Sequence, residues 1–192
     1  MTRHRFPLNT RRRVEGGLFL IAFMLTIPLA NWMIGHVGTV CTLDGVCLLP
    51  VAPGLMAPSG VAMIGAALVL RDLVQRRLGV GFGAAAVIAG SLISAAVAPP
   101  SLVIASAVAF LLSEGADLAV YTPLARKRLV LAVIASSIVG LVIDSMVFLW
   151  LAFGSLDFLG GQIVGKAWMV LLSIPFVAYL RRRDERLGLT PA

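Results

Sequence analysis

Two carboxylates stand in a stretch of this chain that is otherwise apolar enough for lipid. The run 101–110 has no charged residue, and Glu114 and Asp117 follow it directly. A carboxylate inside a bilayer costs roughly 3 kcal/mol or more, unless it faces water or a protein interior. Glu114, Asp117 and Tyr121 follow an i, i+3, i+7 spacing, so all three face one direction on a helix. The pattern predicts a polar interior that binds or carries something.

A second group of polar residues is expected nearer the outside. At about 1.5 Å of rise per residue, Asp144 and Lys166 lie at nearly the same depth of a bilayer core about 30 Å thick. Gln162 lies four residues before Lys166 and projects with it. Asn31 falls in the same outer layer. One interpretation is an ion pair that only joins two helices, although such pairs are poor evidence for stability.

The inner layer fits a purely architectural role less well. The same depth estimate groups Arg71 and Asp72 with Glu114 and Asp117, so one cation meets three carboxylates. The excess negative charge must be protonated, hydrated or neutralised by something that binds. Two polar layers with an acidic excess favour a pathway or binding site. We assign Arg71, Asp72 and Tyr121 to gating or coupling.

Composition places these residues in a membrane protein. The chain is 59% hydrophobic and 13% charged, with a mean hydropathy of +0.99, too apolar for a soluble domain of 192 residues. The net charge of +7 does not indicate nucleic acid, because the basic residues lie in short clusters between apolar runs. Fifteen of the sixteen Lys and Arg fall in clusters at 3–13, 71–77, 126–128 and 181–186. The positive-inside bias makes all four clusters, and both termini, cytoplasmic.

The apolar runs predict one all-α domain, a six-helix multi-pass protein of the bacterial inner (plasma) membrane. The expected spans are 16–35, 57–77, 78–98, 101–124, 129–153 and 159–180. Small residues at four-residue intervals from Ala86 to Ala98, and the pair Gly161 and Gly165, indicate close helix packing. The first span could instead be a signal peptide, but its apolar run is long and it lacks a good cleavage site.

The segment 36–57 contains no Lys or Arg and should lie outside. Cys41 and Cys47 there could form a disulfide that stiffens a lid, or remain two free thiols. With one nearby His they make an incomplete metal-ligand set. Trp32 could stack on a ligand or anchor the helix at the interface. Trp168, two residues beyond Lys166, could stack on a ligand, pack or face lipid.

No enzyme constellation accompanies these residues. The two histidines, His4 and His36, lie in flanking regions, and no nucleophile–base pair, phosphate loop or metal motif is present. Intramembrane proteolysis by paired aspartates would need an aspartyl signature that the sequence lacks. We therefore expect neither catalysis nor a cofactor.

Four stretches resemble the queuosine-precursor transporters, also called the vitamin uptake transporter family. They are LRDLVQRRLG at 70–79, SEGADLAVY at 113–121, SSIVGLVIDS at 136–145 and GQIVGK at 161–166. Each is short, but their order, with a charged residue at each expected helix, makes the combined resemblance fairly specific. It extends from Asn31 to the sixth span.

The resemblance implies a six-helix bundle similar to the substrate-binding subunits of energy-coupling-factor importers. It also implies uptake of 7-deazaguanines such as 7-cyano-7-deazaguanine and its aminomethyl relative. The positions that match the family's polar set are Asp72, Asp117, Asp144 and Lys166. Family members often carry Asn where this chain has Leu141, which leaves the substrate open.

A guanine-like base is compatible with these residues. One edge of the base offers an N–H and an amine to a carboxylate, and aromatic rings can stack on its face. We expect Glu114 to make that edge contact. The full expected substrate-binding set is Asn31, Glu114, Asp117, Asp144, Gln162, Lys166 and Trp168.

Two other functions remain open at this point. One is a carrier of similar fold for a vitamin or another small metabolite. The other is a membrane scaffold without transport, in which small-residue stripes contact partners. Expected partners are a small molecule and the lipid bilayer, with homo-oligomers as an open alternative and no nucleic acid.

Overall fold

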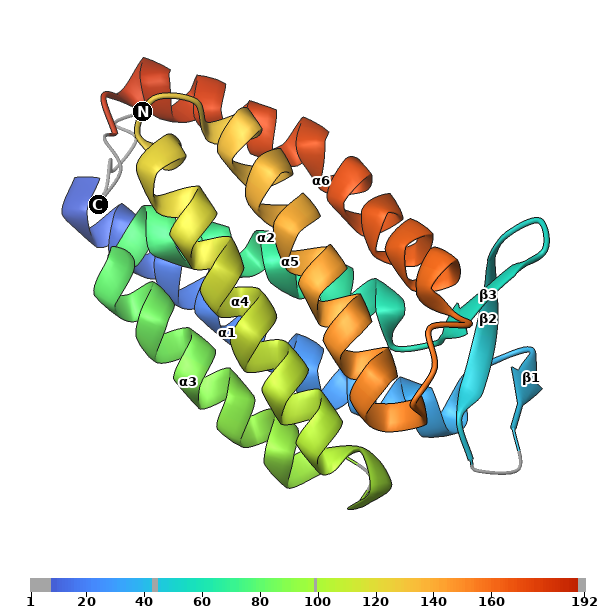
Figure 1. The fold of residues 1–192 in the computed structure, drawn as a ribbon. Coiled ribbons are helices and arrows are strands. Elements are labelled where there is room, and N and C mark those ends of the chain that lie inside the picture. The colour runs from blue at the N-terminus through green and yellow to red at the C-terminus, as the bar shows by residue number, and fades with distance from the viewer. Residues whose placement is uncertain (1–7, 43–44, 99, 190–192) are drawn as a thin grey trace.

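Six helices form one bundle in the computed structural model, which describes residues 8–42, 45–98 and 100–189 (Figure 1). They are α1 (Leu8–His36), α2 (Val61–Leu78), α3 (Val80–Val97), α4 (Val103–Ala125), α5 (Leu129–Phe153) and α6 (Leu159–Leu187). A short 3-10 helix, Pro100–Leu102, precedes α4. Each predicted span coincides with one helix, and α5 has the predicted bounds. Helices α1 and α6 extend beyond their spans at the arginine-rich ends.

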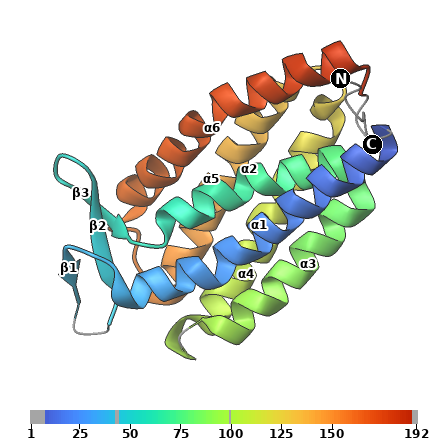
Figure 2. The same cartoon turned by 180° about the vertical axis from the view of Figure 1, so that it is seen from behind.

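Helix α2 differs from the other five because it lies inside the bundle. It contacts every other helix and runs between α1 and α6 in the view of Figure 2. Its four charged side chains, in the segment 71–77, are all buried. The other five helices are long and apolar enough to cross a membrane, and α2 is not among them. Six helices are therefore confirmed, but only five of them are supported as membrane spans.

A small antiparallel sheet covers one end of the bundle. Its strands, in the order β1-β2-β3, are β1 (Val40–Cys41), β2 (Cys47–Ala52) and β3 (Leu55–Pro58). The all-α prediction missed this sheet because the stretch 40–58 holds three prolines, which are unusual in strands. Pro50 is accommodated where the register between β2 and β3 shifts. A disulfide joins Cys41 in β1 to Cys47 in β2.

The bundle has two chemically different ends. The sheet and the α5–α6 connection lie at one end, which we call the sheet end (Figure 1). The start of α1, the α2–α3 and α4–α5 connections and the end of α6 lie at the other, the basic end. Clusters 126–128 and 181–186 are there, with residues 11–13 and 76–77. Residues 1–7 and 190–192, with the predicted cytoplasmic termini, lie outside the described residues.

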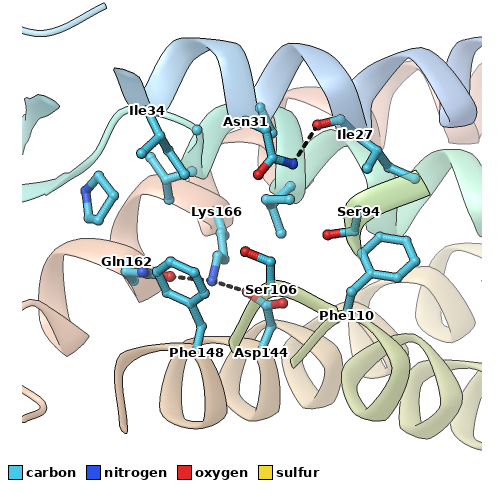
Figure 3. Close-up of a pocket in the computed structure, with 15 residues that line it drawn as sticks. Ile27, Asn31, Ile34, Ser94, Ser106, Phe110, Asp144, Phe148, Gln162 and Lys166 are labelled. Carbon is cyan, nitrogen blue, oxygen red and sulfur yellow. Dashed lines mark hydrogen bonds and ion pairs between the residues drawn. The ribbon is translucent and has the colours of Figure 1, made fainter. Parts of the chain in front are cut away.

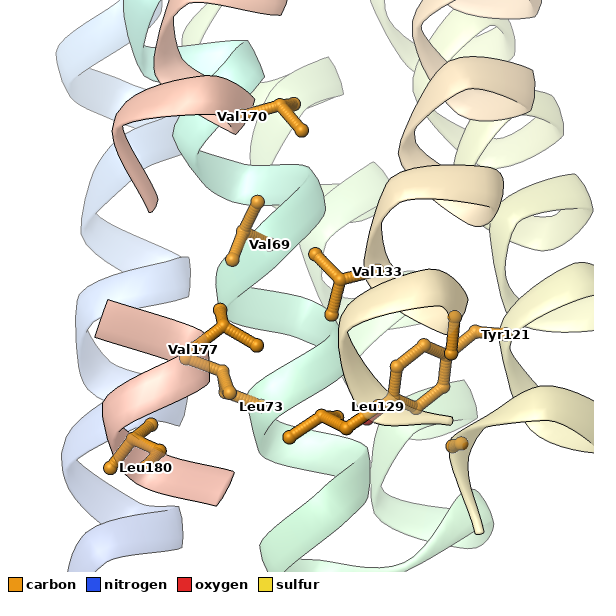
Figure 4. Packing of buried hydrophobic residues seen from close by; sticks show 10 residues of the cluster. Val69, Leu73, Tyr121, Leu129, Val133, Val170, Val177 and Leu180 are labelled. Carbon is orange, nitrogen blue, oxygen red and sulfur yellow. The ribbon is translucent and has the colours of Figure 1, made fainter. Parts of the chain in front are cut away.

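Buried apolar residues close the basic half of the bundle. One cluster joins α2, α4, α5 and α6 around Leu73, Tyr121, Val133 and Val177 (Figure 4). A second lies towards the sheet end around Leu149, and a third joins α1 to α4 around Phe110. Each fully buried side chain of this size is worth about 1.5–3 kcal/mol. Polar groups inside the bundle are thus enclosed by packed apolar layers.

Small residues allow the helices to approach closely. A Cβ on Gly90 of α3 would lie 2.7 Å from the ring of Phe110, and one on Gly65 of α2 would lie 2.7 Å from the backbone oxygen of Lys166. Ala86 and Ser94 are also buried on the same stripe as Gly90. The four-residue stripe therefore packs helix on helix, as expected.

Replacing Gly65 with alanine tests this close approach. The added Cβ must push α6 away at Lys166, so we expect a loss of roughly 1–3 kcal/mol of stability. The matched control is Gly115→Ala on α4, where an added Cβ meets nothing within 4 Å. Thermal unfolding in detergent should show a lower Tm for Gly65→Ala alone. Equal Tm values for both variants would contradict the packing described for α2 and α6.

Candidate functional site

All six helices contribute to one pocket near the sheet end (Figure 3). Its polar lining residues are Asn31, Ser94, Ser106, Asp144, Gln162 and Lys166. Its larger apolar lining residues are Ile27, Ile34, Ile64, Phe110 and Phe148. The space open to the centre of a water-sized sphere is about 50 Å³, which is room for a few water molecules.

Lys166 is the only cation in the lining of this pocket, and it is 1% exposed. Its Nζ donates to Oδ2 of Asp144 at 2.5 Å, to Oγ of Ser145 at 2.8 Å and to Oε1 of Gln162 at 2.5 Å. An ammonium group has three N–H donors, so these three contacts satisfy it. The ion pair links α5 to α6 and holds both side chains at the pocket wall.

Asp144 and Asn31 present oxygen atoms to the pocket from opposite sides. Oδ2 of Asp144 binds Lys166, while Oδ1 has only a long contact of 3.4 Å from Oγ of Ser113. Nδ2 of Asn31 donates to the Ile27 carbonyl oxygen at 3.0 Å. Figure 3 shows the side-chain oxygen, Oδ1, directed into the pocket. The pocket therefore offers acceptors on two walls.

A second polar group, which we call the Arg71 cluster, lies deeper in the bundle. Nη2 of Arg71 is 2.8 Å from Oδ1 of Asp72 and Nε is 3.1 Å from Oε2 of Glu114. Nη2 also pairs with Oδ1 of Asp117, and the Tyr121 ring lies 5.6 Å from the guanidinium carbon. None of these five residues is more than 1% exposed. The cluster is a closed charge group, separate from the pocket lining.

A pocket and a charged group inside one helix bundle are the features that a membrane transporter needs. The family described as putative vitamin uptake transporter matches residues 59–180, more than half of the chain. The chain belongs to this family. The match contains α2 to α5 and most of α6, whereas α1 with Asn31 lies outside it. No curated protein and no solved structure matches the chain.

Membership makes this chain a multi-pass membrane protein of an uptake transporter family. Of the seven expected binding residues, four line the pocket: Asn31, Asp144, Gln162 and Lys166. Glu114 and Asp117 do not, because both carboxylates pair with Arg71. The expectation that Glu114 contacts a bound base at its edge is therefore corrected. Asp144 is the carboxylate that faces the pocket of this transporter.

Trp168 is a second correction. Its side chain is 53% exposed, and Nε1 donates to the Val51 carbonyl oxygen at 3.1 Å, outside the pocket. Two residues beyond Lys166 is about 200° around a helix, so the indole faces away from the ammonium group. Trp32 is 52% exposed and stacks on His36, with ring centroids 5.1 Å apart. Neither indole of the transporter is placed to stack on a ligand in the pocket.

The aromatic residues at the pocket are Phe110 and Phe148, which the sequence analysis missed. Helical spacing could have found them, because Phe148 lies four residues after Asp144 and Phe110 lies four residues before Glu114. Ser106 lies one further turn before Phe110 on the same face. Ser94 could also have been found, since it belongs to the small-residue stripe of α3. The pocket thus has two rings and two hydroxyls that had no assigned role.

Buried and partly buried ion pairs join three helices at the basic end of the transporter. Asp184 of α6 accepts from Nη2 of Arg76 at 3.0 Å and from Nη1 of Arg77 at 2.8 Å. Glu15 of α1 accepts from Nε of Arg77 at 2.9 Å and from Nη2 of Arg183 at 2.6 Å. The sequence analysis treated these arginines as topology signals only. They also tie α1, α2 and α6 together at the end farthest from the pocket.

Proposed function

We propose that this chain imports queuosine precursors, 7-cyano-7-deazaguanine and its aminomethyl relative, across the bacterial inner membrane. The pocket near the sheet end, where Asp144, Lys166 and two phenylalanines meet, is the observation that carries the proposal. The basic end would face the cytoplasm, in line with the positive-inside bias. Family membership supports uptake, and the pocket supports a small flat polar ligand.

Each wall of the pocket offers chemistry that suits a deazaguanine. Oδ1 of Asp144 can accept from the ring N–H and the amine on one edge. The NH2 group of Gln162, whose Oε1 already accepts from Lys166, can donate to the carbonyl oxygen of the base. Phe110 and Phe148 provide aromatic faces for the bicyclic ring. An aminomethyl substituent would add a positive charge, which Asp144 attracts.

The described conformation is too tight for a whole base. A pocket that admits only a few water molecules is smaller than a substituted bicyclic ring. Phe148 is 8% exposed and belongs to the apolar cluster beneath the sheet. We expect its ring to turn when a base enters, so that the pocket widens towards the sheet end.

Uptake of labelled 7-cyano-7-deazaguanine by cells that cannot synthesise it tests the proposal. Cells with the wild-type chain should accumulate the base above cells with empty vector. No difference between the two, with the protein present in the membrane, would overturn the assignment. Unlabelled aminomethyl relative should compete with the label.

Replacing Phe148 with alanine should weaken binding. Stacking of a base on an aromatic ring is worth about 1–3 kcal/mol, so we expect affinity to fall by roughly five- to 150-fold. Phe82→Ala on α3 is the control, because that residue is 56% exposed and is not among the lining residues. Titration of the purified protein by calorimetry gives both values. Unchanged affinity in Phe148→Ala would show that the Phe148 ring does not contact the ligand.

A vitamin with a flat heteroaromatic ring is the second candidate, because apolar side chains make up most of the lining. Thermal stabilisation by a panel of deazaguanines, purines and vitamins separates the two, since only a ligand that binds the folded state raises Tm. A scaffold without transport should respond to none of them.

A further inference from the structure

The Arg71 cluster carries more acid than base. Arg71 and Asp72 come from α2, and Glu114 and Asp117 come from α4. From α5, the hydroxyl of Ser136 donates to Oδ2 of Asp72 at 2.9 Å. One guanidinium can offset one carboxylate, and like charges at such distances disfavour a second and third ionised group.

Among the described residues, no further cation pairs with this cluster. Lys166 of α6 is paired with Asp144, and Arg76 of α2 is paired with Asp184. Helix α3 has no charged residue, and the charged residues of α1 within the described range all lie in 11–15, apart from His36 at its other end. The excess acid must therefore be neutralised by bound protons or by another cation.

A proton fits better than a metal ion. Arg71 already occupies the centre of the three carboxylates, so an added cation would meet a buried positive charge. Within the described residues, no group of three or more His, Cys, Asp and Glu side chains could hold a metal ion. The buried hydroxyl of Tyr121 on α4 also has no hydrogen-bond partner among the residues that the structure describes. An oxygen without a partner is available to a mobile proton.

Polar side chains lie on both sides of the Arg71 cluster. Towards the sheet end, the hydroxyl of Ser113, the residue before Glu114 on α4, lies 3.4 Å from Oδ1 of Asp144 and 3.2 Å from the Phe110 carbonyl oxygen. Towards the basic end, Nη1 of Arg71 donates to Oε1 of Gln75 at 3.2 Å, and Nε2 of Gln75 donates to Oγ1 of Thr122 at 3.0 Å.

Gln75 and Thr122 line a hollow at the basic end. Its volume, by the same measure as for the pocket, is about 310 Å³, and Tyr121 and Arg126 also line it. The Arg71 cluster thus stands between a pocket on one side and a hollow on the other. This is where a group must lie if it is to exchange protons with both sides in turn.

We propose that the Arg71 cluster is a proton-coupling site, which takes up a proton from the pocket side and releases it towards the basic end as substrate is imported. This rests on the proposed function. The proton is held by a carboxylate of Asp72, Glu114 or Asp117, and no bond in the substrate is made or broken. Proton movement accompanies substrate movement, so the proton gradient drives accumulation.

Purified protein in liposomes tests this with two transport modes. Exchange of labelled for unlabelled 7-cyano-7-deazaguanine needs binding and movement only, whereas accumulation under an imposed proton gradient also needs coupling. Glu114→Gln, which keeps the shape and removes the titratable group, should retain exchange within about twofold and lose gradient-driven accumulation at least about tenfold. Glu185→Gln, an exposed residue of α6, is the matched control and should keep both modes.

The outcomes separate the two proposals. Wild-type exchange without any response to a proton gradient, or accumulation driven by sodium instead, overturns the coupling site and leaves the importer standing. Normal accumulation by Glu114→Gln also overturns it. Absence of wild-type exchange overturns the importer and the coupling together.

A readout without substrate covers the case in which Glu114→Gln does not fold. Infrared spectra of the wild-type protein at neutral pH should contain the carbonyl band of a buried protonated carboxylic acid. The band should weaken in Glu114→Gln or in Asp117→Asn and persist in Glu185→Gln. A wild-type spectrum without this band shows that the cluster holds no proton and overturns the proposal.

Discussion

Asparagine in place of Asp144 is expected to abolish import and also to lower Tm, because Lys166 loses its buried counter-ion. The amide still accepts a hydrogen bond from Lys166, but it loses the charge that faces the pocket. Removing one partner of a buried charged contact with a ligand costs about 2–5 kcal/mol, so uptake at low substrate should fall by roughly 30-fold or more. Initial rates of labelled uptake, normalised to protein in the membrane, measure this loss.

The control for Asp144→Asn is Asp157→Asn. Asp157 lies in the α5–α6 connection at the sheet end, is exposed, and contacts Ser155. The same change of charge there should leave uptake unaltered. Normal uptake by Asp144→Asn would mean that the carboxylate only joins α5 to α6.

Methionine in place of Arg71 is expected to destabilise the bundle most. The change leaves three carboxylates with no cation in a buried site, and breaking a buried ion pair from one side costs about 3–5 kcal/mol. Arg181→Met is the control, since Arg181 and Glu185 form an exposed pair worth about 1 kcal/mol or less. Thermal unfolding and the yield of monodisperse protein in detergent give the comparison.

A compensating variant shows whether charge is the cause. Adding Glu114→Gln and Asp117→Asn to Arg71→Met removes two of the three orphaned acids and should restore much of the lost Tm. Contacting residues in one network are expected to couple in this way. A triple variant as unstable as Arg71→Met would point instead to lost packing of the arginine side chain.

The helix order and the two polar layers could be predicted because both depend only on position along the chain. Apolar runs fix where helices lie, and a constant rise per residue fixes depth. This is why 129–153 agrees with α5, and why Asp144 and Lys166 were expected at one level. Depth does not say which way a side chain points around the helix axis. Glu114 was therefore assigned to the pocket, although it pairs with Arg71.

Other features depend on contacts between distant parts of the chain. Asp184 binds Arg76 and Arg77 from more than one hundred residues away, and no local pattern indicates that pairing. The strands of the sheet were not predicted, because prolines interrupt their sequence pattern. In contrast, the sequence could have predicted that Trp168 points away from the pocket, because its angular position relative to Lys166 follows from helical geometry alone.

The central place of α2 constrains how the chain enters the membrane. Arg71 pairs with Asp72 of α2 itself and with acids on α4, and Arg76 pairs with an acid on α6. The acids on α4 and α6 are synthesised after α2, and a segment this charged gains little from lipid by itself. We therefore expect helix α2 to reach its final position late in biogenesis, after the C-terminal helix has been synthesised.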